Sequence, residues 1–192
     1  MDKTVCIQIS GGAFLMPAVL LLFLPIQWVF SMVVAAAIHE LCHIAAIWSM
    51  NGRIFRISIG MRGAQIETET MHPFKELICA LAGPLGSALL LLTSQWFPRL
   101  AICGAVHFMY NCLPLLPFDG GRILRNLMVL LFPPARSEQI WQVSHNVIRG
   151  LLAAAVLFLA VKYGWVILLF GIVLLKSARR KTSCQQTLLA IQ

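Results

Sequence analysis

Residues 12–50 read GAFLMPAVLLLFLPIQWVFSMVVAAAIHELCHIAAIWSM, an apolar run with few polar side chains. One straight helix needs about 20 residues to cross the hydrocarbon core of a bilayer, so this run is long enough for two helices. Pro25, with Gln27 close behind it, is the natural break because proline interrupts a helix. The run therefore predicts two membrane helices, at about 12–26 and 28–49.

The composition of the whole chain also favours a membrane protein. Of the 192 residues, 59% are hydrophobic and 11% are charged, whereas about a quarter of a soluble domain is charged. This balance excludes an ordinary soluble domain and a disordered chain. The net charge of +8 comes without a recognised nucleic-acid motif. We therefore expect the bases to face the lipid bilayer rather than a nucleic acid.

Further apolar segments complete the expected architecture. They lie at about 74–96, 100–117, 142–161 and 164–176. The sequence thus predicts an all-α polytopic membrane protein with about six transmembrane helices, and one membrane-embedded domain over 1–192. Within it we expect a core region at about 12–125, helices five and six at about 142–176, and a short basic tail at 177–192.

The positions of the basic residues give an orientation. If the N-terminus is cytoplasmic and the spans number six, all but two of the 15 Lys and Arg residues lie on or near the cytoplasmic side. The exceptions are Arg99 and Lys162. Such a bias is what the positive-inside rule requires. It predicts a multi-pass protein of the cell membrane with cytoplasmic N- and C-termini.

The segment Arg53–Thr70 differs from its apolar surroundings. Polar and apolar residues alternate in Arg56–Ile59 and again in Gln65–Thr68, with a glycine at each end of the stretch between them. This pattern predicts a small β-hairpin at the cytoplasmic membrane face, after the second helix. A surface loop is the alternative. The edges of a hairpin could bind an extended substrate segment.

Residues 39–43 of the second helix read HELCH, an HExxH motif. Residues one helical turn apart share a face, so His39 and His43 can bind one Zn²⁺ while Glu40 takes a proton from water. A glutamate at membrane depth is costly and usually has a functional reason to be there. The alternative is a buried His–Glu pair with only a structural role.

A catalytic zinc site usually has three protein ligands and one open position. Most other acids fall in expected loops or at span ends, whereas Asp119 closes the fourth expected span, within Asn111–Gly121. The prolines and glycines of this segment break the helix, and such breaks are tolerated where they line a polar cavity. Asp119 is therefore the best candidate for a third ligand, although a Pro-rich helix end with an aspartate is also a common turn.

The two motifs together resemble those of the site-2 proteases, a family of intramembrane zinc metalloproteases. The family pattern is HExxH followed on a later helix by Asn-x-x-Pro-x-x-Pro-x-Asp-Gly, and this chain has HELCH at 39–43 and NCLPLLPFDG at 111–120. Its segment AGPLGS at 82–87 is similar to the Gly-Pro signature of the family. The resemblance implies one Zn²⁺ per chain, held by His39, His43 and Asp119, with Glu40 as the general base.

The resemblance also implies a zinc metalloendopeptidase of regulated intramembrane proteolysis. Its substrate would be a membrane-associated precursor, cleaved within or near the membrane, with membrane regulatory partners and no nucleic acid. Asn111 would bind the substrate backbone or the developing oxyanion, or it bonds a neighbouring helix. The alternative function is a non-proteolytic zinc-binding membrane protein or a metal transporter, which would need a relay of acids or histidines across the membrane.

The small six-span layout is most similar to family members that act in sporulation, which trim the pro-sequence of a sigma factor precursor. That similarity implies a forespore membrane. Those proteins carry a C-terminal nucleotide-sensing (CBS) domain, whereas the sequence ends at Gln192 without one. Ser87 stands where many relatives have Asn, and Cys42 where Gly is common.

Several other residues of the expected helices have a plainer interpretation. Gly83 and Gly86 predict close helix packing, with a direct role at the active site as the alternative. Cys42 and Cys112 are expected to pack as small apolar side chains. His107 is a candidate polar contact between helices.

Overall fold

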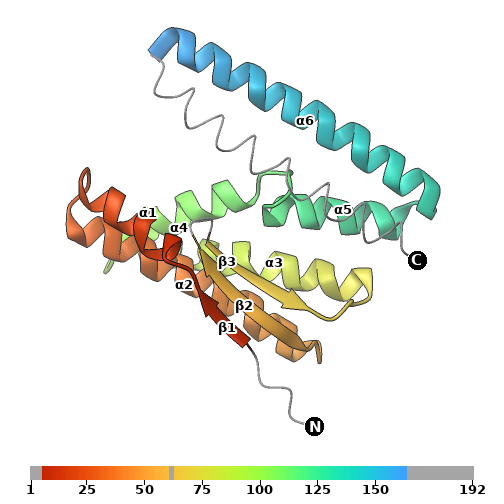
Figure 1. Cartoon of the computed structure of the whole chain (residues 1–192), viewed down its shortest axis with the longest axis horizontal. Coiled ribbons are helices and arrows are strands. Elements are labelled where there is room, and N and C mark those ends of the chain that lie inside the picture. Colours follow the sequence, from red (N-terminus) through yellow and green to blue (C-terminus); the bar gives the residue numbers. More distant parts are fainter. Residues whose placement is uncertain (1–5, 61–62, 164–192) are drawn as a thin grey trace. The chain divides into compact units, whose positions relative to one another are not determined.

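The computed structural model describes residues 6–60 and 63–163 of the chain. It divides into two compact units, Met1–Asn111 and Cys112–Gln192 (Figure 1). The first unit contains β1 (Cys6–Ile9), α1 (Gly12–Leu21), α2 (Ile26–Ser49), β2 (Ile54–Gly60), β3 (Gly63–Thr68), α3 (Pro73–Leu89), the 3₁₀ turn η1 (Leu90–Thr93) and α4 (Pro98–Asn111). The second unit contains α5 (Asp119–Leu131) and α6 (Pro134–Tyr163).

Helix α2 carries the HExxH motif, and both of its ends follow from the sequence. It begins directly after Pro25, so the expected break at this proline is confirmed. At its other end Asn51 adopts a left-handed conformation with φ 56°. The Gly52 N–H donates to the Ile47 carbonyl at 2.8 Å and the Asn51 N–H to the Trp48 carbonyl at 3.0 Å. This is a Schellman motif, which gives hydrogen-bond donors to carbonyls that would otherwise lack them at the C-terminal end of the helix.

A three-stranded sheet follows the order β1-β2-β3. Strands β2 and β3 pair antiparallel within the segment Arg53–Thr70, so the expected hairpin is confirmed. Strand β1 pairs parallel to β2, with Cys6 opposite Arg56 and Ile9 opposite Ile59. Strand β1 is not predicted from the sequence. The helices α1 and α2 connect the two parallel strands, as a parallel pair requires a crossover.

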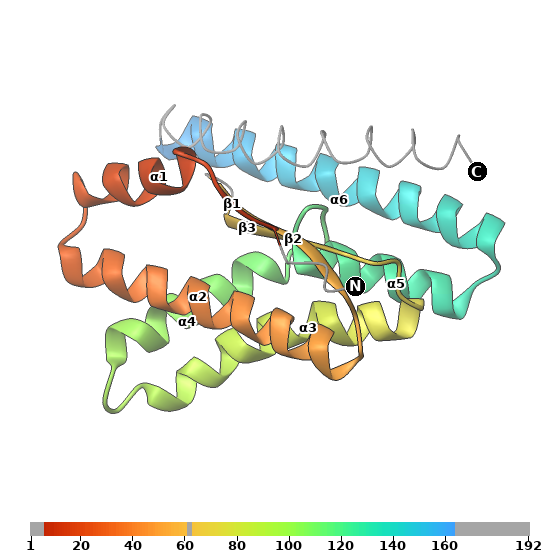
Figure 2. The ribbon, with the colours of Figure 1, turned by 60° about the horizontal axis from the view of Figure 1, so that its bottom comes forward.

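Two small cores hold the first unit together. One joins Ile47 of α2, Ile54 of β2 and Cys79 of α3, so the sheet packs against these two helices (Figure 2). The other joins Ala35 of α2 and Cys103 of α4 through Leu90. Helix α2 therefore has α3 and α4 as neighbours, and its buried face is where the HExxH histidines lie.

In the second unit, α5 packs against α6 and is preceded by the irregular segment Cys112–Phe118. This segment contains a cis peptide bond between Leu116 and Pro117. Its backbone approaches the first turn of α5 closely, because a β carbon at Gly120 would overlap the Cys112 carbonyl. Asp119 is the first residue of α5. The expectation that Asp119 closes the fourth span was wrong, since α4 already ends at Asn111.

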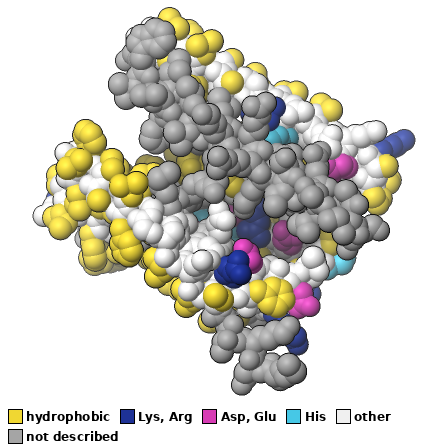
Figure 3. All heavy atoms as spheres, in the orientation of Figure 1, with side chains coloured by type: hydrophobic (Ala, Val, Ile, Leu, Met, Phe, Trp, Pro, Cys, Tyr) yellow, Lys and Arg dark blue, Asp and Glu magenta, His cyan; other side chains and the backbone are white. Residues whose placement is uncertain are grey.

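Among the described residues, three segments are long and apolar enough to cross a membrane: Ile26–Ser49, Pro73–Thr93 and Pro134–Lys162. The first expected span is a shorter apolar helix, α1, and the fourth is the 14-residue helix α4. The sixth expected span, 164–176, lies outside the described residues. The count of six spans therefore stays a prediction. Large hydrophobic side chains lie exposed on α1 and the start of α2 (Figure 3), as a lipid-facing surface would have them.

Candidate metal centre

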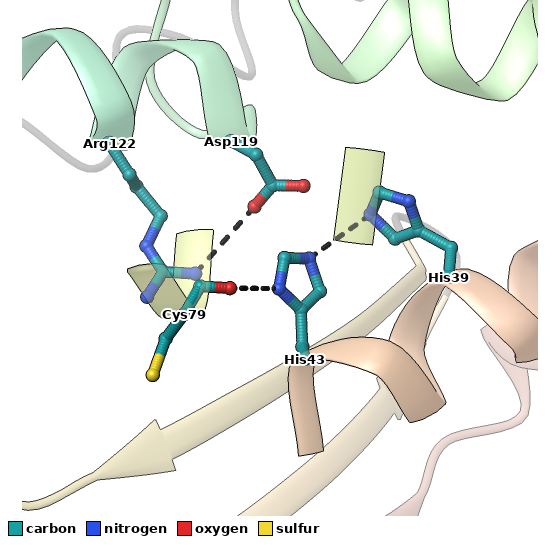
Figure 4. A network of polar contacts seen from close by, with 5 residues as sticks. All are labelled: His39, His43, Cys79, Asp119 and Arg122. Atoms are coloured by element: carbon teal, nitrogen blue, oxygen red, sulfur yellow. Dashed lines mark hydrogen bonds and ion pairs between the residues drawn. The ribbon is translucent and has the colours of Figure 1, made fainter. Parts of the chain in front are cut away.

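His39 and His43 lie on the buried face of α2, with 2% and 5% of their surfaces exposed. Their spacing of one helical turn brings the two Nε2 atoms to 3.1 Å from each other. The rings meet edge to face, with centroids 4.7 Å apart (Figure 4). Two imidazole nitrogens thus converge on one point beside the helix.

The outer nitrogens of both rings are held by helix α3. The Nδ1–H of His43 donates to the backbone carbonyl of Cys79 at 2.7 Å (Figure 4). Nδ1 of His39 lies 2.9 Å from the hydroxyl oxygen of Ser87, which is fully buried. Metal-binding histidines almost always bond their second nitrogen to a carbonyl, a carboxylate or a similar group, which fixes the ring and its tautomer.

The Cys79 carbonyl determines which nitrogen of a neutral His43 ring carries the proton. A carbonyl oxygen can only accept, so the proton of the neutral ring is on Nδ1 and Nε2 carries a lone pair. That lone pair points at Nε2 of His39, within hydrogen-bonding distance. The two histidines therefore have the donor type and ring orientation of a zinc site.

Helix α3 comes close to α2 at this point because it has glycines there. A β carbon at Gly83 would overlap Nε2 of His43, and one at Gly86 would overlap the sulfur of Cys42. The expected close packing of Gly83 and Gly86 is thus what the structure has. Gly83 also borders Nε2 of His43, and a direct role for this glycine at the active site stays a prediction. Cys42 packs against α3 as a small side chain.

Glu40 follows His39 on α2 and is half-buried. Its place in the motif puts a carboxylate next to the converging imidazoles, on an adjacent part of the helix surface. A carboxylate there can accept a proton from a water molecule and release it again.

In the second unit Asp119 is buried, with 7% of its surface exposed. It stands in the first turn of α5, where the helix dipole stabilises a negative charge. Arg122, one turn later, lies 3.6 Å from its carboxylate (Figure 4). A buried carboxylate oxygen is the third donor type that zinc accepts from proteins.

Asn111 and His107 lie one turn apart on α4. The Asn111 side-chain amide donates to the His107 carbonyl at 3.1 Å, so part of its bonding capacity is used within its own helix. Its role toward a substrate stays a prediction. The His107 ring stands edge-on against His39, with centroids 4.7 Å apart. His107 is therefore a contact between α4 and α2, and it lies closer to the metal centre than the sequence suggested.

Neither hydrogen-bond partner of the two histidines is predicted from the sequence. Cys79 acts through its backbone carbonyl, for which no side-chain type gives a signal. Ser87 stands out in the sequence only as a departure from the family pattern; its signal as a partner is a hydroxyl in an apolar helix, two turns after Cys79 on the same face.

Comparison with known proteins gives two likenesses, and no family model matches the chain. The chain is 27% identical, over 180 residues, to a candidate zinc metalloprotease of Synechocystis sp.. The match covers 85% of this chain and 42% of that protein, so the chain spans less than half the length of this relative.

The fold is similar to that of a solved site-2 protease. The solved structure of the Site-2 Protease from Methanocaldococcus jannaschii matches 94% of this chain and 92% of its own, with a TM-score of 0.68 and 21% sequence identity.

Proposed function

We propose that this chain is a membrane-embedded zinc metalloprotease of the site-2 type. His39, His43 and Asp119 would hold one zinc ion, and Glu40 would serve as the general base. Each of the three proposed ligands is buried and offers one suitable atom, an imidazole nitrogen or a carboxylate oxygen. The fold likeness and the sequence relative support the proposal.

The main structural support for a metal site is the arrangement of the two HExxH imidazoles. The two Nε2 atoms of the HExxH motif face each other at 3.1 Å while both Nδ1 atoms are engaged by α3. A buried His–Glu pair with only a structural role gives no reason for both rings to turn the same nitrogen inward. That arrangement is typical of histidines that bind one metal ion.

Each residue of the proposed site has its own role in the reaction. When bound, zinc would polarise the scissile carbonyl and make a water molecule a competent nucleophile near neutral pH. Glu40 takes the proton of the attacking water and passes it to the leaving amine. Asn111 would donate to the substrate backbone or to the oxyanion. Arg122 supports the negative charge of Asp119.

The substrate class follows from the membrane setting. A helical substrate hides its carbonyls in its own hydrogen bonds, so it must be extended before water can attack. Strand β3 pairs only with β2 among the described residues, which leaves its other edge to an extended segment. We propose a membrane-associated precursor as the substrate. A sporulation sigma factor pro-sequence, with both termini of this chain cytoplasmic, is the first specific case to test.

A metal transporter is the second candidate. In the described part of the chain, no second group of His, Cys, Asp or Glu residues could hold a metal. A transport path through the membrane usually needs a series of such groups. Proteolysis is therefore the better supported function.

The test is a comparison of new protein N-termini in membranes that contain the wild-type chain or its Glu40→Gln form. Wild-type protein should generate N-termini at or near membrane segments, and the variant should generate none while it retains zinc. Zinc uptake into proteoliposomes is measured with the same two proteins. Uptake without new N-termini would replace the protease by the transporter.

A further inference from the structure

A polar cavity of about 210 Å³ lies where α2 ends and α3 begins. The two helices belong to candidate membrane spans, and only the hairpin of β2 and β3 separates them in the chain. The cavity therefore lies at the level where both helices leave the hydrocarbon of the bilayer. The exposed ring of Trp48, in the last turn of α2, marks the same level, because tryptophan is enriched at membrane interfaces.

The walls of this cavity carry charges of opposite sign. Lys75 of α3 and Glu69, which follows β3, both line it. Within residues 6–60 and 63–163, neither of these two side chains forms an ion pair. The Lys75 ammonium donates one hydrogen bond, to the Met50 carbonyl at 3.2 Å. An ammonium group has three donors, so Lys75 can also donate to a ligand.

The ends of the two helices add partial charges in the same pattern. The C-terminal end of α2 is partially negative, and the N-terminal end of α3 is partially positive. His72, which also lines the cavity, caps α3, and its Nδ1 accepts the Phe74 N–H at 3.3 Å. A neutral His72 ring therefore carries its proton on Nε2 and can donate it to a ligand. The cavity thus offers donors and a carboxylate acceptor to one small molecule.

We propose that this cavity binds the headgroup of a phospholipid that carries both a phosphate and a primary ammonium, the chemistry of phosphatidylethanolamine. Lys75 and His72 would donate to phosphate oxygens, and Glu69 would accept from the ammonium. A headgroup without an ammonium would leave Glu69 facing only negative charge. A choline headgroup has no N–H to donate to it.

The size of the cavity agrees with a headgroup. Pockets that enclose a whole drug-sized ligand have volumes of roughly 300–1,000 Å³. A cavity of about 210 Å³ is smaller, so it can take the polar end of a lipid while the acyl chains stay in the bilayer.

The inference does not depend on the proposed protease, because none of the proposed zinc ligands lines the cavity, nor does Glu40. Glu40→Gln, which should abolish cleavage, should bind the lipid as the wild type does. A chain that binds the lipid but cleaves nothing would refute the protease alone.

The test is native mass spectrometry of the full chain, equilibrated in detergent with equal amounts of three lipids that have the same acyl chains. These lipids are phosphatidylethanolamine, phosphatidylglycerol and phosphatidylcholine. The wild type should retain phosphatidylethanolamine in preference to the other two. Lys75→Ala and Glu69→Gln should each weaken this retention by about fivefold, which corresponds to the interaction of one charge near a membrane surface. Lys75→Arg keeps the charge and should retain the lipid.

Two matched controls change a charge outside the cavity. Arg99→Ala removes an exposed base in the first turn of α4, and Glu67→Gln removes an acid of β3 that pairs with Arg56 at 4.0 Å. Neither residue lines the cavity. Both variants should retain the lipid as the wild type does. Circular dichroism of every variant shows that its helices are intact.

Three outcomes would overturn the proposal. The first is equal retention of the three lipids by the wild type, and the second is a preference for phosphatidylethanolamine that both Lys75→Ala and Glu69→Gln keep. The third comes from adding soluble glycerophosphoethanolamine as a competitor. If it displaces the lipid at an equal concentration, the cavity binds a soluble zwitterion and the assignment to a membrane lipid is wrong.

Discussion

The backbone of Gly83 lies so close to Nε2 of His43 that a β carbon on Gly83 would overlap the imidazole. Cys79, one turn earlier on α3, holds the other nitrogen of the same ring through its carbonyl. Helix α3 therefore both orients His43 and limits the space on its metal-facing side. A substitution that adds a single methyl group there tests whether this space is needed for the metal.

Gly83→Ala should lower zinc affinity at least about tenfold. This is the range seen when a group that orients a metal-binding side chain is mutated. The added carbon would overlap the His43 ring and force it to move. Zinc content after dialysis against a chelator measures the effect. Gly150→Ala on α6 is the control, because a β carbon there meets nothing within 4 Å. Equal zinc retention by the two variants would contradict the assignment of His43.

Glu40→Gln should keep zinc bound and abolish cleavage. The amide is nearly the same shape as the carboxylate, but it cannot take up the proton of the attacking water. Zinc content and the release of new N-termini are measured on the same preparation. Cleavage that survives this substitution would remove Glu40 as the general base.

Asp119→Ala should lower zinc affinity more than the roughly 10- to 100-fold expected for a residue that merely supports a ligand. Loss of the carboxylate removes a donor atom and leaves Arg122 without an ion pair that it now makes at 3.6 Å. Glu138→Gln removes another acid of the second unit, one that pairs with Arg125 at 4.0 Å, and should leave zinc content unchanged. Full zinc occupancy in Asp119→Ala would exclude Asp119 as a ligand.

Removal of the metal and a lowered pH should both reduce proteolytic activity, because both take zinc from the site. Protons compete with zinc for the Nε2 atoms, so zinc affinity should fall as pH is lowered. Incubation with a chelator should abolish cleavage, and added Zn²⁺ should restore it. Replacement by Co²⁺ gives a visible absorption band that reports the ligands directly. Cleavage that persists in fully metal-depleted protein would rule out a metalloprotease.

Gly121→Ala should destabilise the second unit by about 1–3 kcal/mol, the usual cost of overpacking a tight contact. A β carbon at Gly121 would overlap the backbone of Leu115, and backbone atoms have less freedom to move aside than a flexible side chain. Thermal unfolding in detergent measures the change, with Gly150→Ala again as the control. An unchanged melting temperature would mean that the backbones at Gly121 and Leu115 leave room for a methyl group.

The features that the sequence predicts well are local. The break at Pro25 depends on a property of proline itself, and the placement of His39 and His43 on one face depends only on helical spacing. The hairpin within Arg53–Thr70 is also local, since its strands are neighbours in the chain. In each case the determining interaction spans only a few residues.

What the sequence does not predict depends on contacts between distant segments. The pairing of Cys6–Ile9 with β2 joins strands on either side of two helices, and a strand of four residues carries too little alternation to be recognised alone. The bond from His43 to the Cys79 carbonyl involves a backbone atom that every residue has. The start of α5 at Asp119 was missed because the prolines before it were read as the end of one helix only.

Strand β1 is made before α1 and α2, whereas its partner β2 follows both helices in the chain. A ribosome adds about 5–20 residues per second, so β1 waits on the order of seconds for a partner while the two helices emerge. The parallel pair can close only after the chain has turned back at Pro25 and α2 has reached its end at Asn51. The small sheet is thus a late step in biogenesis. It can pair only after both helices have been synthesised.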